Sequence, residues 1–506
     1  MSIYLIAIIL TIYLLLCSRN IQAGFLVLLA SLPLYLLRFD IFNIPLTVLE
    51  GMIFICFFVW VSEDYKKIFS SIKNKILGLK KSKNEISRYP FDIEIVLVVV
   101  ISFVAVFTAG LSNSALGIWK AYFFESALVY IMFFNILFAE KDKIFKNKNL
   151  DHWYLKIVLA FSVSAFFVSL FAIYQKLTGN FISNEVWALA ETRRVTSFFA
   201  YPNALGLFLA PIIMLQLGAL MFQRHKSKEN CDRVDCAKWN PWSLEWFKRM
   251  SGTEKTYFSF VKLTAVLSLV SIYFARSEGA LIAVMAGMFL ALLLFESFKS
   301  WGNFRLVGIG IALLLLILLF SSPFRDFTMT RISLNDFSGQ IRKAQWEETA
   351  VYLRDGNWLW GAGLSEYQEK IAPYHKEGIY IKNDDPDFEH LIQVDPEYQK
   401  KHWQALEIFL YPHNVFLNFW VELGVFGMIL FIWIIFRAIY ISFSLLNRVE
   451  DLANRFLIIG ALGAILTVII HGIVDVPFFK NDLAVLFWMM VATLGALDLK
   501  LKNKNK

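Results

Sequence analysis

Long runs of apolar residues, almost free of charge, limit most strongly how this chain can fold. Examples are residues 96–109, 128–139, 157–174 and 306–320. A run of about 20 apolar residues matches the ~30 Å hydrocarbon core of a lipid bilayer. Of the 506 residues, 58% are apolar and 18% are charged, whereas an ordinary soluble domain carries about 25% charged residues. The sequence therefore predicts an all-α, polytopic integral membrane protein.

The apolar runs predict thirteen spans, within a range of about 12–14 transmembrane helices. The first run has no basic start and no small-residue cleavage site, so we expect it to be retained as a span. The predicted spans are 3–17, 21–37, 45–61, 93–109, 121–139, 156–175, 203–222, 258–275, 280–295, 306–322, 415–438, 456–474 and 483–497.

The distribution of lysine and arginine predicts the orientation of these spans. Six segments fall on one side and together hold most of the basic residues: 62–92, 140–155, 223–257, 296–305, 439–455 and the tail 498–506. Basic connections stay in the cytoplasm, so we expect this side, including the C-terminus, to be cytoplasmic. The net charge of +8 is then a signal of topology. We expect no nucleic-acid partner, because the basic loops lack interleaved aromatic residues in a folded domain.

One long connection, 323–412, lies on the opposite, outer side. It carries 10 Lys and Arg against 15 Asp and Glu, and a connection of this length between spans is usually functional. Two stretches within it are predicted to be helical, residues 338–354 and 397–409. The chain is therefore divided into an N-terminal part with spans 1–5 (1–139), a central part with spans 6–10 (140–322), the external loop (323–412) and a C-terminal part with spans 11–13 and the basic tail (413–506).

Cationic residues recur at the outer ends of separate spans. They are Lys120, Arg193, Arg194, Arg276 and His413. Because all five lie at one depth, the sequence predicts a shared pocket for a polyanion. The alternative is that each side chain extends separately to the lipid headgroups.

Three further polar residues lie within or beside the spans. Glu50 lies in the third span, where a carboxylate is costly unless it is paired, and we expect it to pair with an outer cation. His471 and Asp475 are four residues apart, a spacing that places both on one helix face. They are expected to orient each other or to cap the helix.

The acidic stretch Asp384-Asp385-Pro386-Asp387 could in principle bind a metal ion, but this is not the interpretation we prefer. The stretch is polar, turn-rich and far in sequence from any span, so a solvated loop is preferred. Cys231 and Cys236 lack the second ligand pair that a zinc site needs. We expect no metal and no cofactor.

Five short motifs, far apart in the sequence, follow one another in a fixed order. The strongest is His413-Asn414, followed after nine residues by Gly424-Val-Phe-Gly427. It resembles the pattern H-[NSQ]-x9-G-x2-G of the O-antigen ligase and O-antigen polymerase superfamily. Four other stretches match in order: Arg194 through Pro202-Asn203, Ser277-Glu-Gly-Ala-Leu281, Arg342…Trp346 with Trp360-Gly-Ala-Gly363, and His471-Gly-Ile-Val-Asp475. The family turn usually has Arg directly before Gly-Ala, where this chain has Glu278, so Arg276 matches less securely.

The resemblance implies a membrane glycosyltransferase of polysaccharide biosynthesis in the cell envelope. It implies transfer of a glycan from undecaprenyl diphosphate to an acceptor hydroxyl at the outer face of the cytoplasmic (inner) membrane. His413 would be the general base, and the transfer would invert the anomeric centre. Arg194, Arg276, Lys120 and Arg193 would bind the diphosphate. Asn414, Glu50, Arg342, His471 and Asp475 would support the site.

Other functions are compatible with the same sequence features. A polysaccharide or lipid-linked-sugar transporter, or a flippase, also has 12–14 spans, although such proteins usually show internal repeats and helices interrupted at mid-membrane. A peptidoglycan-type polymerase would share the donor but should lack the His-Asn motif. The acceptor is equally open: a lipid core sugar, a growing glycan or a protein hydroxyl, as in a protein O-oligosaccharyltransferase.

Overall fold

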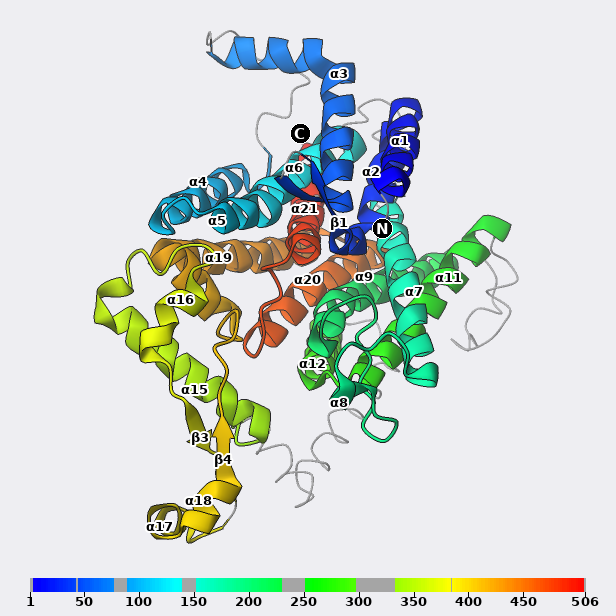
Figure 1. The fold of residues 1–506 in the computed structure, drawn as a ribbon. Helices are drawn as coiled ribbons and strands as arrows, with labels where there is room; N and C mark the ends of the chain where they lie inside the picture. The colour runs from blue at the N-terminus through cyan, green and yellow to red at the C-terminus, as the bar shows by residue number, and fades with distance from the viewer. Residues whose placement is uncertain are drawn as a thin grey trace.

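The computed structural model describes residues 3–41, 44–76, 89–138, 152–229, 251–296, 333–383 and 385–504. Within these ranges the chain is a bundle of helices (Figure 1). Seven helices are long and apolar enough to cross a membrane, and three shorter apolar helices accompany them. The prediction of an all-α polytopic membrane protein is confirmed. The predicted span 306–322 lies outside the described residues.

The N-terminal part contains a break that the hydropathy pattern did not predict. Instead of one span over 21–37, the chain forms α2 (Ile21–Ala30) and a short 3₁₀ helix, η1 (Leu32–Leu36). Pro33 lies in the first turn of η1, where its missing N–H is tolerated, whereas it cannot continue α2. Ten residues of α-helix rise only about 15 Å. The prediction of a full second span is therefore wrong.

The other N-terminal elements follow the predicted order. A two-stranded hairpin links η1 to the third helix, and the fifth predicted span is a continuous helix that includes two π-helical segments. The elements are α1 (Ile3–Arg19), β1 (Arg38–Ile41), β2 (Ile44–Thr47), α3 (Val48–Ile76), α4 (Asp92–Thr108), α5 (Asn113–Ile118), η2 (Trp119–Phe124), α6 (Glu125–Met132) and η3 (Phe133–Phe138).

The central part packs around α9 (Pro202–Glu229), which contacts α7, α11, α12 and α20. Gly218 allows the closest approach: a Cβ there would lie 2.8 Å from the Cα of Gly460 in α20. Two helices can pack this tightly only where neither carries a side chain. The remaining elements are α7 (His152–Thr178), α8 (Glu185–Ala188), α11 (Gly252–Ala275), α12 (Glu278–Glu296) and α20 (Leu452–Gly472).

The described part of the long connection folds as an appendage beside the bundle (yellow-green to yellow in Figure 1). The predicted helix over 338–354 is found as α15 (Phe337–Tyr352), which continues into a π-helical segment. The predicted helix over 397–409 is wrong beyond His402, because the chain turns into strand β4, which pairs antiparallel with β3. The elements are η5 (Leu353–Asn357), α16 (Tyr367–Ile371), η6 (Ala372–Tyr374), β3 (Gly378–Tyr380), α17 (Phe388–Val394), α18 (Pro396–His402) and β4 (Trp403–Ala405).

The C-terminal part contains α19 (Val415–Arg448), α20 and α21 (Asn481–Lys504). α19 is broken at Gly424, whose φ is 72°, a conformation that glycine adopts at little cost. The loop after α15 fits into this break. The Val425 N–H donates to Leu359 O at 3.2 Å, and the Ala362 N–H donates to Val421 O at 2.6 Å. The loop thus replaces hydrogen bonds that the helix lost, and fixes the first half of α19.

Candidate active site

A pocket of about 530 Å³ lies where α15, the segment before α19 and the segment before α9 meet. This volume falls within the usual range of small-molecule sites, roughly 300–1,000 Å³. Elements that are far apart in the sequence contribute to it. Its lining residues are Trp187, Arg194, Tyr201, Pro202, Asn203, Phe337, Ser338, Ile341, Arg342, Gln345, Phe409, Leu410, Tyr411, His413 and Asp475.

His413 lines this pocket and is held from two sides. Its Nδ1 lies 3.0 Å from Oε1 of Gln345, and the preceding carbonyl, Pro412 O, accepts a hydrogen bond from Trp346 Nε1 at 2.8 Å. The backbone of His413 has φ 45°, a region that non-glycine residues enter at some cost. Burial lowers the pKa of His413 below its usual 6.5, and the nearby charge of Arg342 lowers it further, while Asp475 opposes the shift. The imidazole is therefore neutral near pH 7.

Asn414 connects the start of α19 to the turn after α20. Its Oδ1 accepts from the backbone N–H groups of Phe416 and Leu417, at 3.0 and 3.1 Å. Its Nδ2 donates to Ile473 O at 3.0 Å. Asn414 is thus an N-cap, and its amide group also joins two helices at the edge of the pocket.

Arg194 and Arg276 lie side by side, but of the two only Arg194 lines the pocket, so the predicted shared pocket does not include Arg276. Arg194 Nε donates to Ala275 O at 3.0 Å, at the end of α11. Arg276 is the C-cap of that helix, with φ 51°, and its side chain is exposed. Burial, and then the charge of Arg276, lowers the pKa of Arg194. Two like charges this close favour the arrival of an anion.

Arg342 lies in the pocket itself, whereas the sequence predicted only a supporting role for it. It lies on α15, three residues before Gln345, and both side chains line the pocket. Its charge acts on His413 and on Arg194. Its Nε is buried and has no hydrogen-bond partner among the described residues. An unpartnered guanidinium N–H costs free energy unless a ligand accepts from it.

The N-terminus of α9 adds a third cationic element. Pro202 and Asn203, the first two residues of this 28-residue helix, line the pocket. The first N–H groups of a helix lack intrahelical partners, and the helix dipole places partial positive charge there. Together with Arg194 and Arg342, this helix end makes the pocket complementary to phosphate.

His471 and Asp475 do not share a helix face, so that prediction is wrong. α20 ends at Gly472, and Asp475 lies in the following turn. Its Oδ1 accepts from the Val476 N–H at 2.8 Å, while its buried Oδ2 has no partner among the described residues. Asp475 lines the pocket. His471 packs beneath it against Gly279, where a Cβ would meet the imidazole at 2.9 Å.

Two predicted diphosphate ligands lie elsewhere. Lys120 is paired with Glu50, with Nζ 3.3 Å from Oε1, so the expected partner of Glu50 is found. Arg193 donates from Nη1 to Lys176 O at 2.9 Å and from Nε to Ala188 O at 3.2 Å. Both acceptors are backbone carbonyls, one in the last turn of α7 and the other at the end of α8. Neither Lys120 nor Arg193 lines the pocket.

The residues predicted from the sequence did not include Gln345, Tyr201, Tyr411 or Lys480. The hydroxyl oxygens of Tyr201 and Tyr411 lie 2.5 Å apart, and Lys480 lies over the Tyr201 ring, 4.0 Å from its centre. A signal for Gln345 was present: Ser338, Ile341, Arg342 and Gln345 follow the i, i+3, i+4, i+7 spacing of one helix face. No comparable spacing links Tyr201, Tyr411 and Lys480.

Within the described ranges, no three His, Cys, Asp or Glu side chains gather as a metal site. Asp384, in the acidic stretch considered above, lies outside those ranges.

The fold and the site define a class: a multi-pass helical membrane protein whose pocket joins a neutral histidine to two arginines. A family model described as O-antigen ligase matches residues 263–432, about a third of the chain. This segment includes α15, His413 and the Gly424 break. The match supports the O-antigen ligase and polymerase superfamily, and the resemblance seen in the motifs is confirmed. A search of curated proteins found no match.

Proposed function

We propose that this protein is a lipid-linked oligosaccharide glycosyltransferase of the O-antigen ligase or polymerase type. It transfers a glycan from undecaprenyl diphosphate to an acceptor hydroxyl. The observation that carries the proposal is the single pocket that holds His413, Arg194 and Arg342. A neutral base and fixed cations are what glycosyl transfer from a diphosphate requires.

The donor's leaving group explains the arginines. As the anomeric C–O bond breaks, negative charge develops on the diphosphate. Arg194 and Arg342 lie where they can stabilise that charge, and a guanidinium binds two phosphate oxygens at once. Further donors are the Nε of Arg342, which has no partner among the described residues, and the N–H groups at the start of α9. No metal ion takes part in the proposed step.

The acceptor hydroxyl explains the histidine. His413 removes the hydroxyl proton, the acceptor oxygen bonds to the anomeric carbon, and the C–O bond to the diphosphate breaks. Undecaprenyl diphosphate leaves with the bonding electron pair. Because attack and departure occur on opposite faces of the sugar, the anomeric configuration is inverted. A general base of this kind contributes about 10²–10⁴-fold to the rate.

We further propose that the pocket faces the outer side of the cytoplasmic membrane and that the C-terminus is cytoplasmic. The basic connections and the tail support this orientation through the positive-inside rule. The acceptor is a growing glycan, a lipid core sugar or a protein hydroxyl.

The test measures glycan transfer and donor level together. The purified protein receives undecaprenyl-diphosphate oligosaccharide and each acceptor class in turn, and cells carrying His413→Ala are examined for lipid-linked donor. Transfer should fall about 10²–10⁴-fold while donor accumulates at the outer face. A transporter or flippase would instead lose donor at that face. Full transfer by His413→Ala would contradict the proposed mechanism.

A further inference from the structure

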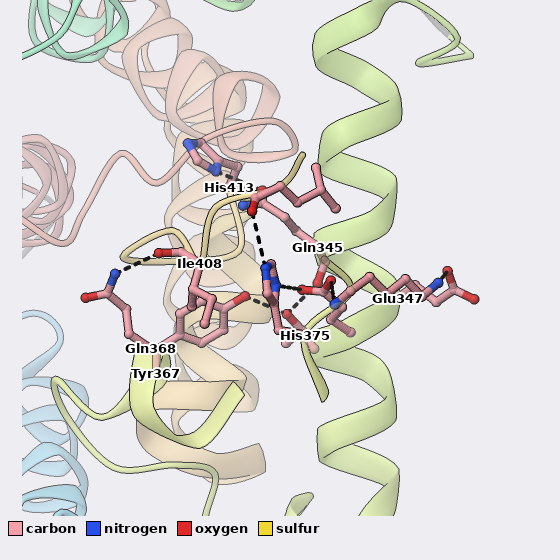
Figure 2. A network of polar contacts seen from close by, with 11 residues as sticks. Gln345, Glu347, Tyr367, Gln368, His375, Ile408 and His413 are labelled. Carbon is pink, nitrogen blue, oxygen red and sulfur yellow. Dashed lines mark hydrogen bonds and ion pairs between the residues drawn. The ribbon is translucent and has the colours of Figure 1, made fainter. Parts of the chain in front are cut away.

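Gln345 makes the only side-chain hydrogen bond that the described residues offer to the His413 ring: Oε1 lies 3.0 Å from Nδ1. Figure 2 shows the two residues in one polar network with His375 and Tyr367. Gln345 is 4% exposed and projects from α15. A buried side chain on a helix has few alternative positions, so this contact is well defined.

The direction of the hydrogen bond decides which ring nitrogen can act as base. A carbonyl oxygen only accepts, so Nδ1 must carry the proton when it faces Oε1. A neutral imidazole has one protonated nitrogen, and Nε2 is then unprotonated. Nε2 is therefore the atom able to take the acceptor's proton. Without Gln345, the ring can adopt either tautomer, and the fraction in the competent form falls.

The backbone before His413 is also held by α15 and by the segment that follows it. Three side chains from this part of the chain contact carbonyls of that backbone. His375 Nε2 lies 3.4 Å from Leu406 O, Gln368 Nε2 donates to Ile408 O at 2.8 Å, and Trp346 Nε1 donates to Pro412 O at 2.8 Å. With the backbone fixed in this way, the ring's remaining freedom is its rotation and its tautomer. Phe409 and Tyr411 pack against the His413 ring, with centroids 5.2 and 5.0 Å away, and so limit its rotation. Gln345 is the residue that decides the tautomer.

We propose that Gln345 is a positioning residue that keeps His413 in the Nδ1–H tautomer and so presents Nε2 to the acceptor hydroxyl. This inference rests on the proposed function, because it assigns a role to Gln345 through His413. Gln345 is then part of the site. The proposed location of the proton, on Nδ1 of His413, can be tested without an assay of transfer.

The first measurement is ¹⁵N NMR of the histidine rings in the detergent-solubilised full chain, with the His413 signals assigned by their loss in His413→Ala. At a pH where the ring is neutral, wild type should show the Nδ1–H tautomer. Gln345→Met should show a mixture or the opposite tautomer. An Nε2–H tautomer in wild type overturns the proposal, whether or not transfer has been observed.

The second measurement is the pH profile of transfer for two variants. Gln345→Met has a similar size but no acceptor, and should lower kcat at least about tenfold, up to the ~10²–10⁴-fold that the base supplies, with little change in donor KM. Gln345→Glu keeps an acceptor-only oxygen. It should retain transfer above the His413 pKa, and its negative charge should move the acidic limb to higher pH.

Gln340→Met is the matched control, because it makes the same change on the same helix. Gln340 contacts the Lys382 backbone, donating to its carbonyl at 2.9 Å and accepting from its N–H at 2.8 Å. This variant should leave both the acidic limb and kcat unchanged. If Gln345→Met matches it, or if folded Gln345→Glu is inactive at every pH, the proposal is wrong. Absence of transfer in wild type itself would contradict the proposed function instead.

Discussion

Lys120 Nζ lies 3.3 Å from Oε1 of Glu50, and the other oxygen of that carboxylate accepts from the Thr47 N–H at 2.7 Å. The Glu50 N–H in turn donates to Thr47 Oγ1 at 3.1 Å. Glu50 therefore completes a capping box at the start of α3 and also neutralises Lys120. One carboxylate joins α3 to η2, which accounts for a charged residue in the apolar first half of α3.

Removing the charge of Lys120 should destabilise the protein. Lys120→Met leaves Glu50 without its cation, and the two side chains are only 25% and 5% exposed. Losing one partner of a buried pair costs about 3–5 kcal/mol, and the partial exposure of Lys120 reduces this to roughly 1–3 kcal/mol. Thermal unfolding in detergent measures the loss, and Lys120→Arg should recover most of it. A donor KM raised about tenfold with unchanged stability would instead restore Lys120 as a diphosphate ligand.

Arg342 should matter more to the chemical step than to stability. Arg342→Ala removes a donor aimed at the leaving group, so kcat should fall about 10²–10³-fold, the usual effect of losing one such group. Arg342→Lys keeps the positive charge but loses the guanidinium group that binds two phosphate oxygens at once, so its kcat should be intermediate. The exposed neighbour Lys343 donates to Asn335 Oδ1 at 2.8 Å, and Lys343→Ala should retain the wild-type kcat. If Arg342→Ala and Lys343→Ala change kcat by the same factor, Arg342 has no specific role in the chemical step.

The acidic limb of the pH profile should lie below pH 6.5, because burial lowers the pKa of His413 from that value and the base works only when neutral. Asp475→Asn removes a charge that raises this pKa, so the limb should move to lower pH. Arg342→Met removes a charge that lowers it, so the limb should move to higher pH. Shifts of kcat/KM in the same direction for both variants would exclude His413 as the titrating group.

The break in α19 should tolerate no side chain. At Gly424 a Cβ would lie 2.2 Å from Leu359 O, and φ is 72°. The backbone conformation alone costs an alanine about 1–3 kcal/mol, and the overlap adds to this. Gly424→Ala should lower both the melting temperature and transfer, because the half-helix that follows His413 must move. Gly117→Ala, on α5 with open space around it, is the control and should be neutral.

The proposed orientation predicts opposite labelling of two positions. A cysteine introduced at Lys343, on α15, should react with a membrane-impermeant maleimide in intact cells. A cysteine at Lys502, near the end of α21 and 60% exposed at its side chain, should react only after the membrane is opened. The reverse pattern would place the pocket on the cytoplasmic side and contradict the proposed topology.

Much of the fold was predictable from local patterns, and the exceptions have local causes. Apolar runs located most of the helices, since hydropathy depends on composition over a window. The second span was wrong because a single proline ended α2 within an apolar run. The outer-loop helix that was expected to reach residue 409 was wrong because β4 pairs with β3, and a strand pair depends on residues about 25 positions apart.

The sequence by itself determined that the chain is a helical membrane protein, and its motifs predicted His413 and Arg194 as site residues. It also supplied the spacing that places Arg342 and Gln345 on one face of α15. Only the tertiary structure decided which cations share a pocket with His413: Arg194 and Arg342 do, whereas Lys120 and Arg193 are bound to other groups. A charge at a span end has the same sequence signal in either case. Its partner is chosen by the packing of distant helices, which no local pattern contains.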